Sequence, residues 1–141
     1  MRIADVLSGK GAQVTTVTPH TAVSEVLRLL AEHNLGALPV VDADRLVGIV
    51  SERDVVRRLH ERGVDLLTVT VAEIMTSDVV TCDPHDGVGE LAKIMTDRRF
   101  RHLPVIVDGR LAGIVSIGDL VKARIDMLEQ EREQLESYIA Q

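Results

Sequence analysis

Apolar residues recur at helical spacing in two stretches of the chain, and both stretches predict amphipathic helices. Within each stretch the apolar positions lie three or four residues apart, which places them on one face of a helix. Thr21 precedes the first stretch and Asp86 the second, and both residue types are favoured as N-caps. The apolar faces are predicted to belong to the core, and they comprise Ala22, Val23, Val26, Leu27, Leu30 and Ala31, then Val88, Leu91, Ala92 and Met95.

A short run rich in β-branched residues precedes each predicted helix and predicts a strand. These runs are residues 14–18, closed by Pro19, and residues 79–83, closed by Pro84.

Two aliphatic runs separated by a polar turn follow each predicted helix, and they predict a β-hairpin. The first hairpin spans residues 38–50. The second spans residues 103–115 and turns at Asp108-Gly109, a pair favoured in tight type I′ turns.

The chain is an internal duplication. Residues 16–56 align with residues 81–121 without a gap at a shift of 81 − 16 = 65, and 16 of the 41 aligned positions are identical. Unrelated sequences of globular composition would share about three. Each half is therefore predicted to contain, in order, a strand, a helix, two strands and a helix. A linker is predicted near residues 63–69.

Such a half has one sheet face to cover and too little core to stand alone. We therefore expect an α+β fold, in which two β-α-β-β-α repeats pack sheet to sheet about a pseudo-twofold axis and a C-terminal helix follows. The expected boundaries are residues 1–65 for the first repeat, 66–124 for the second and 125–141 for the helical tail.

Each repeat carries the motif Gly-Ile-Val-Ser-x-x-Asp where its hairpin leads into a helix. The pairs are Ser51 with Asp54 and Ser116 with Asp119. One interpretation is a relative of the capping box, in which serine and aspartate satisfy the helix N-terminus. The other is that a carboxylate at the positive end of a helix accepts both hydroxyls of a ribose cis-diol, as acidic residues do in dinucleotide sites. Two copies in the same local setting favour the ribose interpretation.

The lead-in segments of the two halves, residues 3–7 and 71–75, match at a shift of 71 − 3 = 68 rather than 65. The first half thus has three extra residues, which fall in the glycine-rich stretch of residues 8–12. This stretch is expected to be a flexible loop. Either it is a solvated turn, or its glycines let the backbone approach an anion while Lys10 meets a phosphate.

Composition narrows the possible functions. A net charge of −6 with no basic run disfavours nucleic-acid binding.

The single cysteine, Cys82, excludes an intrachain disulfide and a cysteine-based metal site. It is predicted to be a small strand residue rather than a nucleophile. No apolar run approaches the roughly 18 residues of a membrane span, and no signal peptide opens the sequence. We therefore expect a cytoplasmic protein with no membrane contact. The histidines His20, His33 and His85 are expected to be surface or capping residues rather than metal ligands.

These motifs together resemble a tandem pair of CBS (cystathionine-β-synthase-type) domains, a Bateman module. The resemblance rests on the repeated Leu-Pro-Val and Gly-Ile-Val-Ser-x-x-Asp segments and on Ile-Met-Thr at residues 74–76, and it extends to about Arg124. The sequence is most similar to stand-alone two-CBS proteins of bacteria and plant organelles, which share Lys-Gly near the start, Ser-Glu-Arg-Asp, Arg-His-Leu-Pro-Val and an acidic helical tail.

The resemblance implies two sites for adenosine-containing ligands such as AMP, ATP, NAD or S-adenosylmethionine, in clefts between the repeats. It assigns Ser51, Asp54, Ile49, Val79, Val80, Arg101 and His102 to site one, and Ser116, Asp119, Ile114, Val14, Thr15, Gly36 and Ala37 to site two.

The two implied sites differ in charge. Site one gathers Arg53, Arg101 and His102, a cationic set suited to phosphates. Site two has Gly118 in place of Arg53 and Gly36-Ala37 in place of Arg101-His102. A phosphate at site two would therefore depend on Lys10.

The function implied is that of a non-catalytic regulatory module, which senses an adenine nucleotide and signals to a partner protein whose identity the sequence does not give. A constitutive dimeric scaffold that binds no ligand is an alternative. A small enzyme is less well supported, because the sequence shows no nucleophile with a base and no metal cluster.

The tail is predicted to be a long helix that helps to hold a homodimer. Its apolar residues alternate at spacings of four and three when Arg132 is counted as the polar member, which describes a narrow seam. They are Val121, Ile125, Leu128, Leu135 and Ile139.

Overall fold

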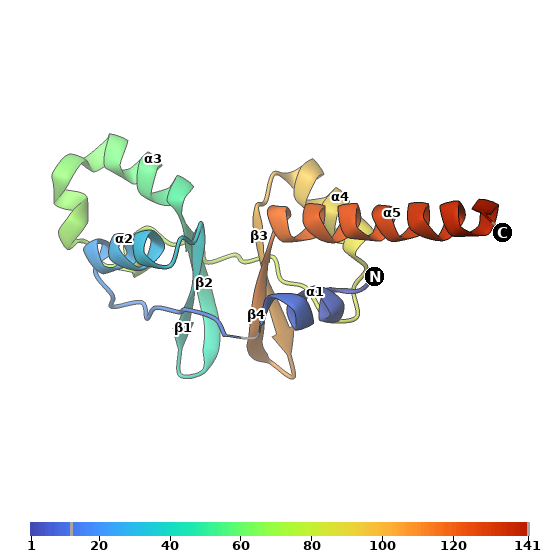
Figure 1. Ribbon diagram of the computed structural model, residues 1–141. Coiled ribbons are helices and arrows are strands. Elements are labelled where there is room, and N and C mark those ends of the chain that lie inside the picture. The colour runs from blue at the N-terminus through green and yellow to red at the C-terminus, as the bar shows by residue number, and fades with distance from the viewer. Residues whose placement is uncertain (12, 141) are drawn as a thin grey trace. The chain divides into compact units, whose positions relative to one another are not determined.

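The computed structural model describes residues 1–11 and 13–140, which form two compact units. We call them the Ser51 unit (Gln13–Val80 and Asp108–Ala112) and the Ser116 unit (Met1–Ala12, Thr81–Val107 and Gly113–Gln141). The Ser51 unit contains α2 (Val23–Glu32), β1 (Ala37–Asp42), β2 (Arg45–Ser51), α3 (Glu52–Arg62) and the 3₁₀ helices η1 (Gly63–Thr68) and η2 (Val71–Glu73). The Ser116 unit contains α1 (Ile3–Lys10), α4 (Val88–Arg98), β3 (His102–Val107), most of β4 (Arg110–Ser116) and α5 (Ile117–Ala140). Figure 1 labels the α-helices and the strands.

Both predicted hairpins are confirmed. Strands β1 and β2 pair antiparallel with Leu38 opposite Val50, and β3 pairs with β4 in a second two-stranded sheet. Both central residues of the second turn, Asp108 and Gly109, have positive φ, at 51° and 77°. This is the geometry of a type I′ turn, which the Asp-Gly pair predicts.

The strands predicted at residues 14–18 and 79–83 are wrong, because each segment makes only one parallel bridge. In the first, Val17 donates to the carbonyl of Pro39 at 3.1 Å and accepts from the N–H of Val41 at 2.8 Å. The next bond in one direction would need an N–H from Pro39, and the next in the other direction an N–H from Pro19. Proline has no N–H to donate, so the ladder stops after one residue.

The second segment repeats this arrangement around Cys82. Its N–H donates to the carbonyl of Pro104 at 2.9 Å, and its carbonyl accepts from Ile106 at 3.0 Å. Pro84 and Pro104 stop the ladder on either side for the same reason.

The two predicted amphipathic helices are present, but the predicted N-caps are wrong. The cap positions are Ala22 for α2 and Gly87 for α4. The Thr21 hydroxyl and the Asp86 carboxylate instead accept backbone N–H groups three residues earlier in the chain, at 3.1 Å and 2.8 Å. They therefore close the turn before each helix. The predicted apolar faces do supply core residues, which include Val23, Val26, Leu30, Val88, Leu91 and Met95.

The lead-in segment at the start of the chain belongs to the Ser116 unit, and the sequence repeat that follows it belongs to the Ser51 unit. At the start of α1, Ile3 donates its backbone N–H to the carbonyl of Asp86 at 2.9 Å, and Ala4 donates to Pro84 at 2.9 Å. Ile3 is fully buried. The N-terminal segment thus completes the core of the second repeat.

The second lead-in segment makes the same bonds in the Ser51 unit. Val71 donates to Thr21 at 2.8 Å, and Ala72 donates to Pro19 at 3.0 Å. The acceptors lie 65 residues before their counterparts, so the duplication is kept at the level of single hydrogen bonds. The units are therefore not divided where the sequence repeats are, and the predicted boundaries at residues 65 and 124 stay a prediction.

Two segments expected to be irregular are helical. Residues 8–10 of the stretch predicted to be a flexible loop continue α1 as far as Lys10, and Gly11, at φ 96°, follows the helix. Ala12, the last residue of the predicted loop, lies outside the described residues. The linker predicted near residues 63–69 is the 3₁₀ helix η1, and its Leu66 is fully buried.

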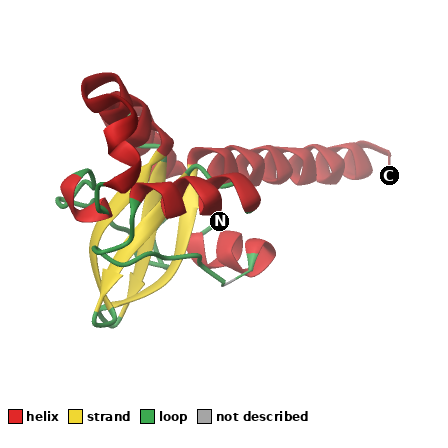
Figure 2. Cartoon of the chain, turned by 90° about the vertical axis from the view of Figure 1, so that its left-hand side faces the viewer, coloured by secondary structure: helices red, strands yellow, loops and turns green. Residues whose placement is uncertain are grey.

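The predicted helical tail is confirmed, because α5 runs without a break over 24 residues from the end of β4. Figure 2 shows it as one continuous helix. Within residues 1–11 and 13–140, no helix combines the length and apolar character that a membrane span requires. The predicted α+β class, with two repeats and a C-terminal helix, is confirmed.

The close approach of the second lead-in segment to β2 gives a test of the fold. A Cβ added at Gly48 would lie 2.6 Å from the Met75 sulfur and 3.0 Å from the Thr76 carbonyl oxygen. We expect Gly48→Ala to lower the free energy of unfolding by about 1–3 kcal/mol through overpacking, as measured by urea denaturation. Gly89→Ala is the control, because no atom lies within 4 Å of its added Cβ and alanine favours a helix by up to about 1 kcal/mol. Equal stability of the two variants would contradict this packing.

Candidate functional site

The Ser51–Asp54 pair forms a capping box at the start of α3. Ser51 is the N-cap, and its hydroxyl accepts the N–H of Asp54 at 3.3 Å. In return the Oδ2 atom of Asp54 accepts the Ser51 N–H at 2.9 Å and the Ser51 hydroxyl at 3.1 Å. The serine and aspartate thereby satisfy part of the helix N-terminus, as the capping interpretation predicts.

The second copy has the same geometry at the start of α5. The Ser116 hydroxyl accepts the N–H of Asp119 at 3.1 Å, and Asp119 Oδ2 accepts the N–H of Ser116 at 2.9 Å. In both copies the cap uses Oδ2 alone, and Oδ1 accepts no hydrogen bond from any residue that the structure describes. Capping therefore leaves one oxygen of each carboxylate available to a ligand, and the capping and ribose interpretations do not exclude each other.

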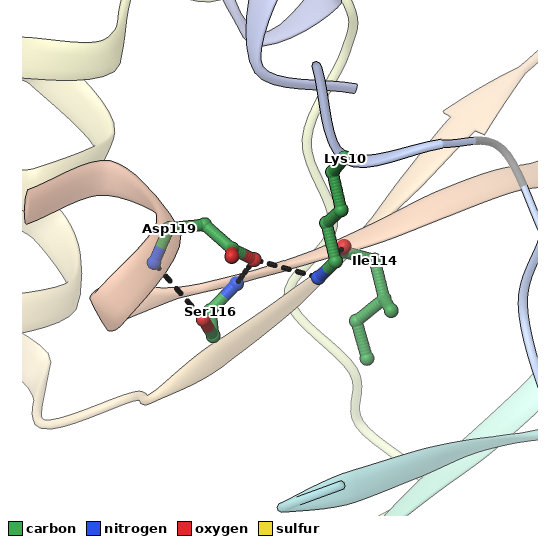
Figure 3. Close-up of polar contacts among 4 residues, drawn as sticks. All are labelled: Lys10, Ile114, Ser116 and Asp119. Carbon is green, nitrogen blue, oxygen red and sulfur yellow. Dashed lines mark hydrogen bonds and ion pairs between the residues drawn. The ribbon is translucent and has the colours of Figure 1, made fainter. Parts of the chain in front are cut away.

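Lys10 distinguishes the second copy from the first (Figure 3). Its ammonium donates to Asp119 Oδ2 at 2.6 Å and to the carbonyl of Ile114 at 2.9 Å. The lysine and aspartate side chains are 37% and 25% exposed, so the ion pair is partly open to solvent. The sequence left Lys10 either in a solvated turn or beside a phosphate, and it did not predict this pairing with the carboxylate.

The environment of Asp119 favours its ionised form. Burial raises the pKa of this carboxyl, but the hydrogen bond from Lys10, the bonds from Ser116 and the charge of Lys10 together outweigh it. The pKa of Asp119 therefore lies below its usual value, and the side chain is a pure hydrogen-bond acceptor at neutral pH.

The backbone before each Leu-Pro strand adjoins the helix start of its own repeat. The Gly36 carbonyl accepts the N–H of Glu52 at 3.0 Å, and the Arg101 carbonyl accepts the N–H of Ile117 at 2.8 Å. Ala37 is the strand partner of Ser51. These bonds fix each Ser-x-x-Asp motif against the hairpin that precedes it.

The remaining candidate residues divide between the units. The Ser51 unit holds Ile49, Val14, Thr15, Val79 and Val80, all half-buried. The Ser116 unit holds Ile114 and His102, also half-buried, and the exposed Arg101. The predicted sites each draw residues from both units, and those groupings stay predictions.

Two predicted phosphate ligands are cations that have no counter-ion among the described residues. Arg53 and Arg101 are exposed, and neither guanidinium has an ion-pair partner among residues 1–11 and 13–140. Over the same residues, the carboxylate of Asp54 also lacks an ion-pair partner.

The chemistry of the described residues gives no support to a metal or thiol centre. No three His, Cys, Asp or Glu side chains among them are placed to hold a metal ion. The Cys82 thiol is buried, and burial together with the nearby charges of Asp86 and Asp83 raises its pKa to about 12. A thiol with so high a pKa is a poor nucleophile at neutral pH.

Comparison with known proteins agrees with these features. The sequence profile of the CBS domain matches residues 4–61 and 71–126. The chain is 35% identical to the mitochondrial CBS domain-containing protein CBSX3 of Arabidopsis thaliana, over 97% of this chain and 71% of that protein.

Solved structures show the same similarity. The CBS-domain containing protein ATU1752 from Agrobacterium tumefaciens matches with a TM-score of 0.85 and 43% identity, over 88% of this chain and 99% of that one. The CBS domain pair of protein MJ0100, solved in complex with 5′-methylthioadenosine and S-adenosyl-L-methionine, matches with a TM-score of 0.78 and 28% identity, over 87% and 98%. The chain belongs to the CBS-domain family and contains a tandem pair of CBS repeats.

Proposed function

We propose that this CBS pair is a non-catalytic regulatory module that binds an adenine nucleotide, AMP, ATP or NAD, through its two Ser-x-x-Asp helix starts. The observation that carries the proposal is the geometry of the two aspartates. Each is held by its serine through Oδ2 and keeps Oδ1 open at the positive end of a helix. A ribose cis-diol offers two hydroxyl donors that such a carboxylate accepts.

The relatives support an adenosine ligand. The MJ0100 domain pair is described with two ligands, and both contain adenosine with an intact ribose diol. A shared ribose-binding carboxylate fits a family whose ligands differ beyond the ribose. The unpaired guanidinium groups of Arg53 and Arg101 suit the phosphates of a nucleotide, which supports AMP, ATP or NAD as the class of ligand.

We infer the regulatory role from membership of the CBS-domain family, and the chemistry of the described residues agrees with it. They present no metal-binding cluster, and the one cysteine is buried, so we assign the ligand to sensing rather than to catalysis. We infer that ligand occupancy is passed to a partner protein. The alternative, a constitutive dimeric scaffold, would have the same fold and would not respond to nucleotides.

Substitution of the two aspartates tests ligand binding. We expect Asp54→Ala and Asp119→Ala each to remove nucleotide binding from one site, because each charge-assisted hydrogen bond contributes about 1.5–3 kcal/mol. Loss of the capping partner costs only about 1 kcal/mol of stability, so both variants should stay folded. Calorimetric titration with AMP, ATP and NAD measures the affinities, and thermal unfolding checks the fold.

The control for this experiment is Asp44→Ala, which removes an exposed carboxylate from the turn between β1 and β2. It should bind as the parent does. If all three variants bind as the parent does, the motifs act only as capping boxes. If the parent binds no adenine ligand, the scaffold alternative holds.

We further propose that the protein is a homodimer to which α5 contributes. The seam residues Val121, Ile125, Leu128, Leu135 and Ile139 are between 47% and 81% exposed in the single chain. Their alternating spacing of four and three is that of a two-stranded coiled coil. Fewer than three heptads do not associate strongly alone, so the tail supports an interface formed mainly by other helices.

Charge substitutions on α5 test the dimer. We expect Ile125→Glu with Leu128→Glu to raise the dimer dissociation constant at least about tenfold, or about 1.4 kcal/mol, because each side chain loses its apolar burial. The matched control is Gln130→Glu with Gln134→Glu, which adds the same charge to the same helix away from the seam. Light scattering across a concentration series measures both. A monomeric parent, or equal effects of the two pairs, would contradict the proposal.

A further inference from the structure

The Lys10–Asp119 ion pair has no counterpart in the first copy of the motif. In the Ser51 unit the carbonyl of Ile49, which corresponds to Ile114, accepts the backbone N–H of Thr76 at 2.9 Å. In the Ser116 unit the ammonium of Lys10 takes that position and also contacts Asp119. The difference arises from the lead-in segments, because α1 continues to Lys10 whereas η2 ends at Glu73.

This difference changes the net charge beside each of the two carboxylates. Asp119 is ionised and directly neutralised by Lys10. Asp54 has no cation paired with it in the described part of the chain. An isolated carboxylate repels a phosphate group on the same ligand, whereas a paired carboxylate does so much less.

The ion pair also competes with a ribose. Lys10 donates to the same Oδ2 atom that completes the cap, and two of its three N–H donors are used by Asp119 and Ile114. A diol that takes both carboxylate oxygens has to displace the ammonium from Oδ2. A nucleoside offers the displaced ammonium no acceptor of opposite charge, whereas a nucleotide offers its phosphate. The four-carbon stem of lysine allows such a shift.

We propose that Lys10 is a specificity-determining residue of the Asp119 site, and that it selects adenosine ligands with a phosphate over unphosphorylated nucleosides. The proposal rests on the proposed function and assigns the phosphate preference of the Asp119 site to Lys10, a residue that the shorter second lead-in segment does not supply to Asp54. Lys10 occupies the carboxylate in the absence of ligand and pairs with the phosphate in its presence. The three residues that lengthen the first lead-in segment are thus the source of a functional difference between the repeats.

The test compares the affinities for AMP and adenosine in an Asp54→Ala background. In this background we expect the measured binding to come from the Asp119 site alone. We expect Lys10→Met to reduce the ratio of AMP affinity to adenosine affinity about tenfold or more, equivalent to about 1.4 kcal/mol. AMP should bind more weakly because its phosphate loses a cation. Adenosine should bind as well or better because nothing competes for Asp119. Added salt should shrink the effect on AMP.

Two control variants separate this role from a general loss of positive charge or of structure. Lys93→Met removes an exposed lysine from α4 and should leave the ratio unchanged. Lys10→Arg keeps the charge and should retain most of the AMP preference. A two-site titration of Lys10→Met in the otherwise unchanged protein gives a second measurement, in which one of the two AMP affinities should fall.

The outcomes distinguish this proposal from the proposed function. If the parent protein binds AMP at two sites and Lys10→Met leaves the AMP-to-adenosine ratio unchanged, Lys10 has no part in selection although the protein binds nucleotides. If Lys93→Met lowers the ratio as much as Lys10→Met does, the effect is one of net charge and the proposal fails. If the parent binds neither compound, both proposals fail.

Discussion

The exchange of lead-in segments is the constraint on which the rest of the structure depends. Each unit is completed by a segment that precedes the other repeat in the sequence, and the same backbone hydrogen bonds hold it in both units. The glycines at the centre of β2 and β4 make room for it, since a side chain at Gly48 would meet Met75 and one at Gly113 would meet Leu7. Without the exchange, the apolar residues of these segments, such as Ile3 and Val71, would lose the core contacts that bury them. The two repeats are therefore interdependent for folding.

The exchange also decides what lies beside each Ser-x-x-Asp motif. The capping boxes are local and nearly identical, because serine, aspartate and the helix start lie within four residues. The lead-in segments are not identical. The longer first segment brings a lysine to Asp119 and to the carbonyl of Ile114, whereas the second brings the backbone N–H of Thr76 to the carbonyl of Ile49. The two carboxylates of the duplicated chain thus acquire different surroundings. In the lead-in segments the difference is three residues in length, while the serine and the aspartate of the motif are the same in both copies.

Local signals in the sequence predicted the features that depend on neighbouring residues. The Asp108-Gly109 turn, both hairpins and the apolar helix faces were correct, because turn chemistry and periodicity act over a few positions. The strands predicted at residues 14–18 and 79–83 failed for a physical reason. Their β-branched composition suits a strand, but prolines in the partner strand and at the end of each segment remove the donors that a longer ladder needs.

The rest of the site depends on contacts between residues far apart in the sequence. The Ser-x-x-Asp carboxylates could be found from their spacing, and their capping geometry followed from local rules. The pairing of Lys10 with Asp119 joins residues 109 positions apart, and it exists only because α1 packs in the second repeat's unit. The sequence showed that the first lead-in segment has three extra residues and that Lys10 lies among them. It did not show that this segment packs in the unit of the second repeat, and without that knowledge Lys10 could not be placed beside Asp119.

The central claim is that the aspartate carboxylates recognise a ribose cis-diol, and calorimetry with deoxynucleotides tests it most directly. AMP, 2′-deoxy-AMP and 3′-deoxy-AMP share the base and the phosphate, and they differ only in the hydroxyls that the carboxylate would accept. A lost charge-assisted hydrogen bond is worth about 1.5–3 kcal/mol, so each deoxynucleotide should bind the parent protein at least about tenfold more weakly than AMP. Equal affinity for the three nucleotides would contradict the account.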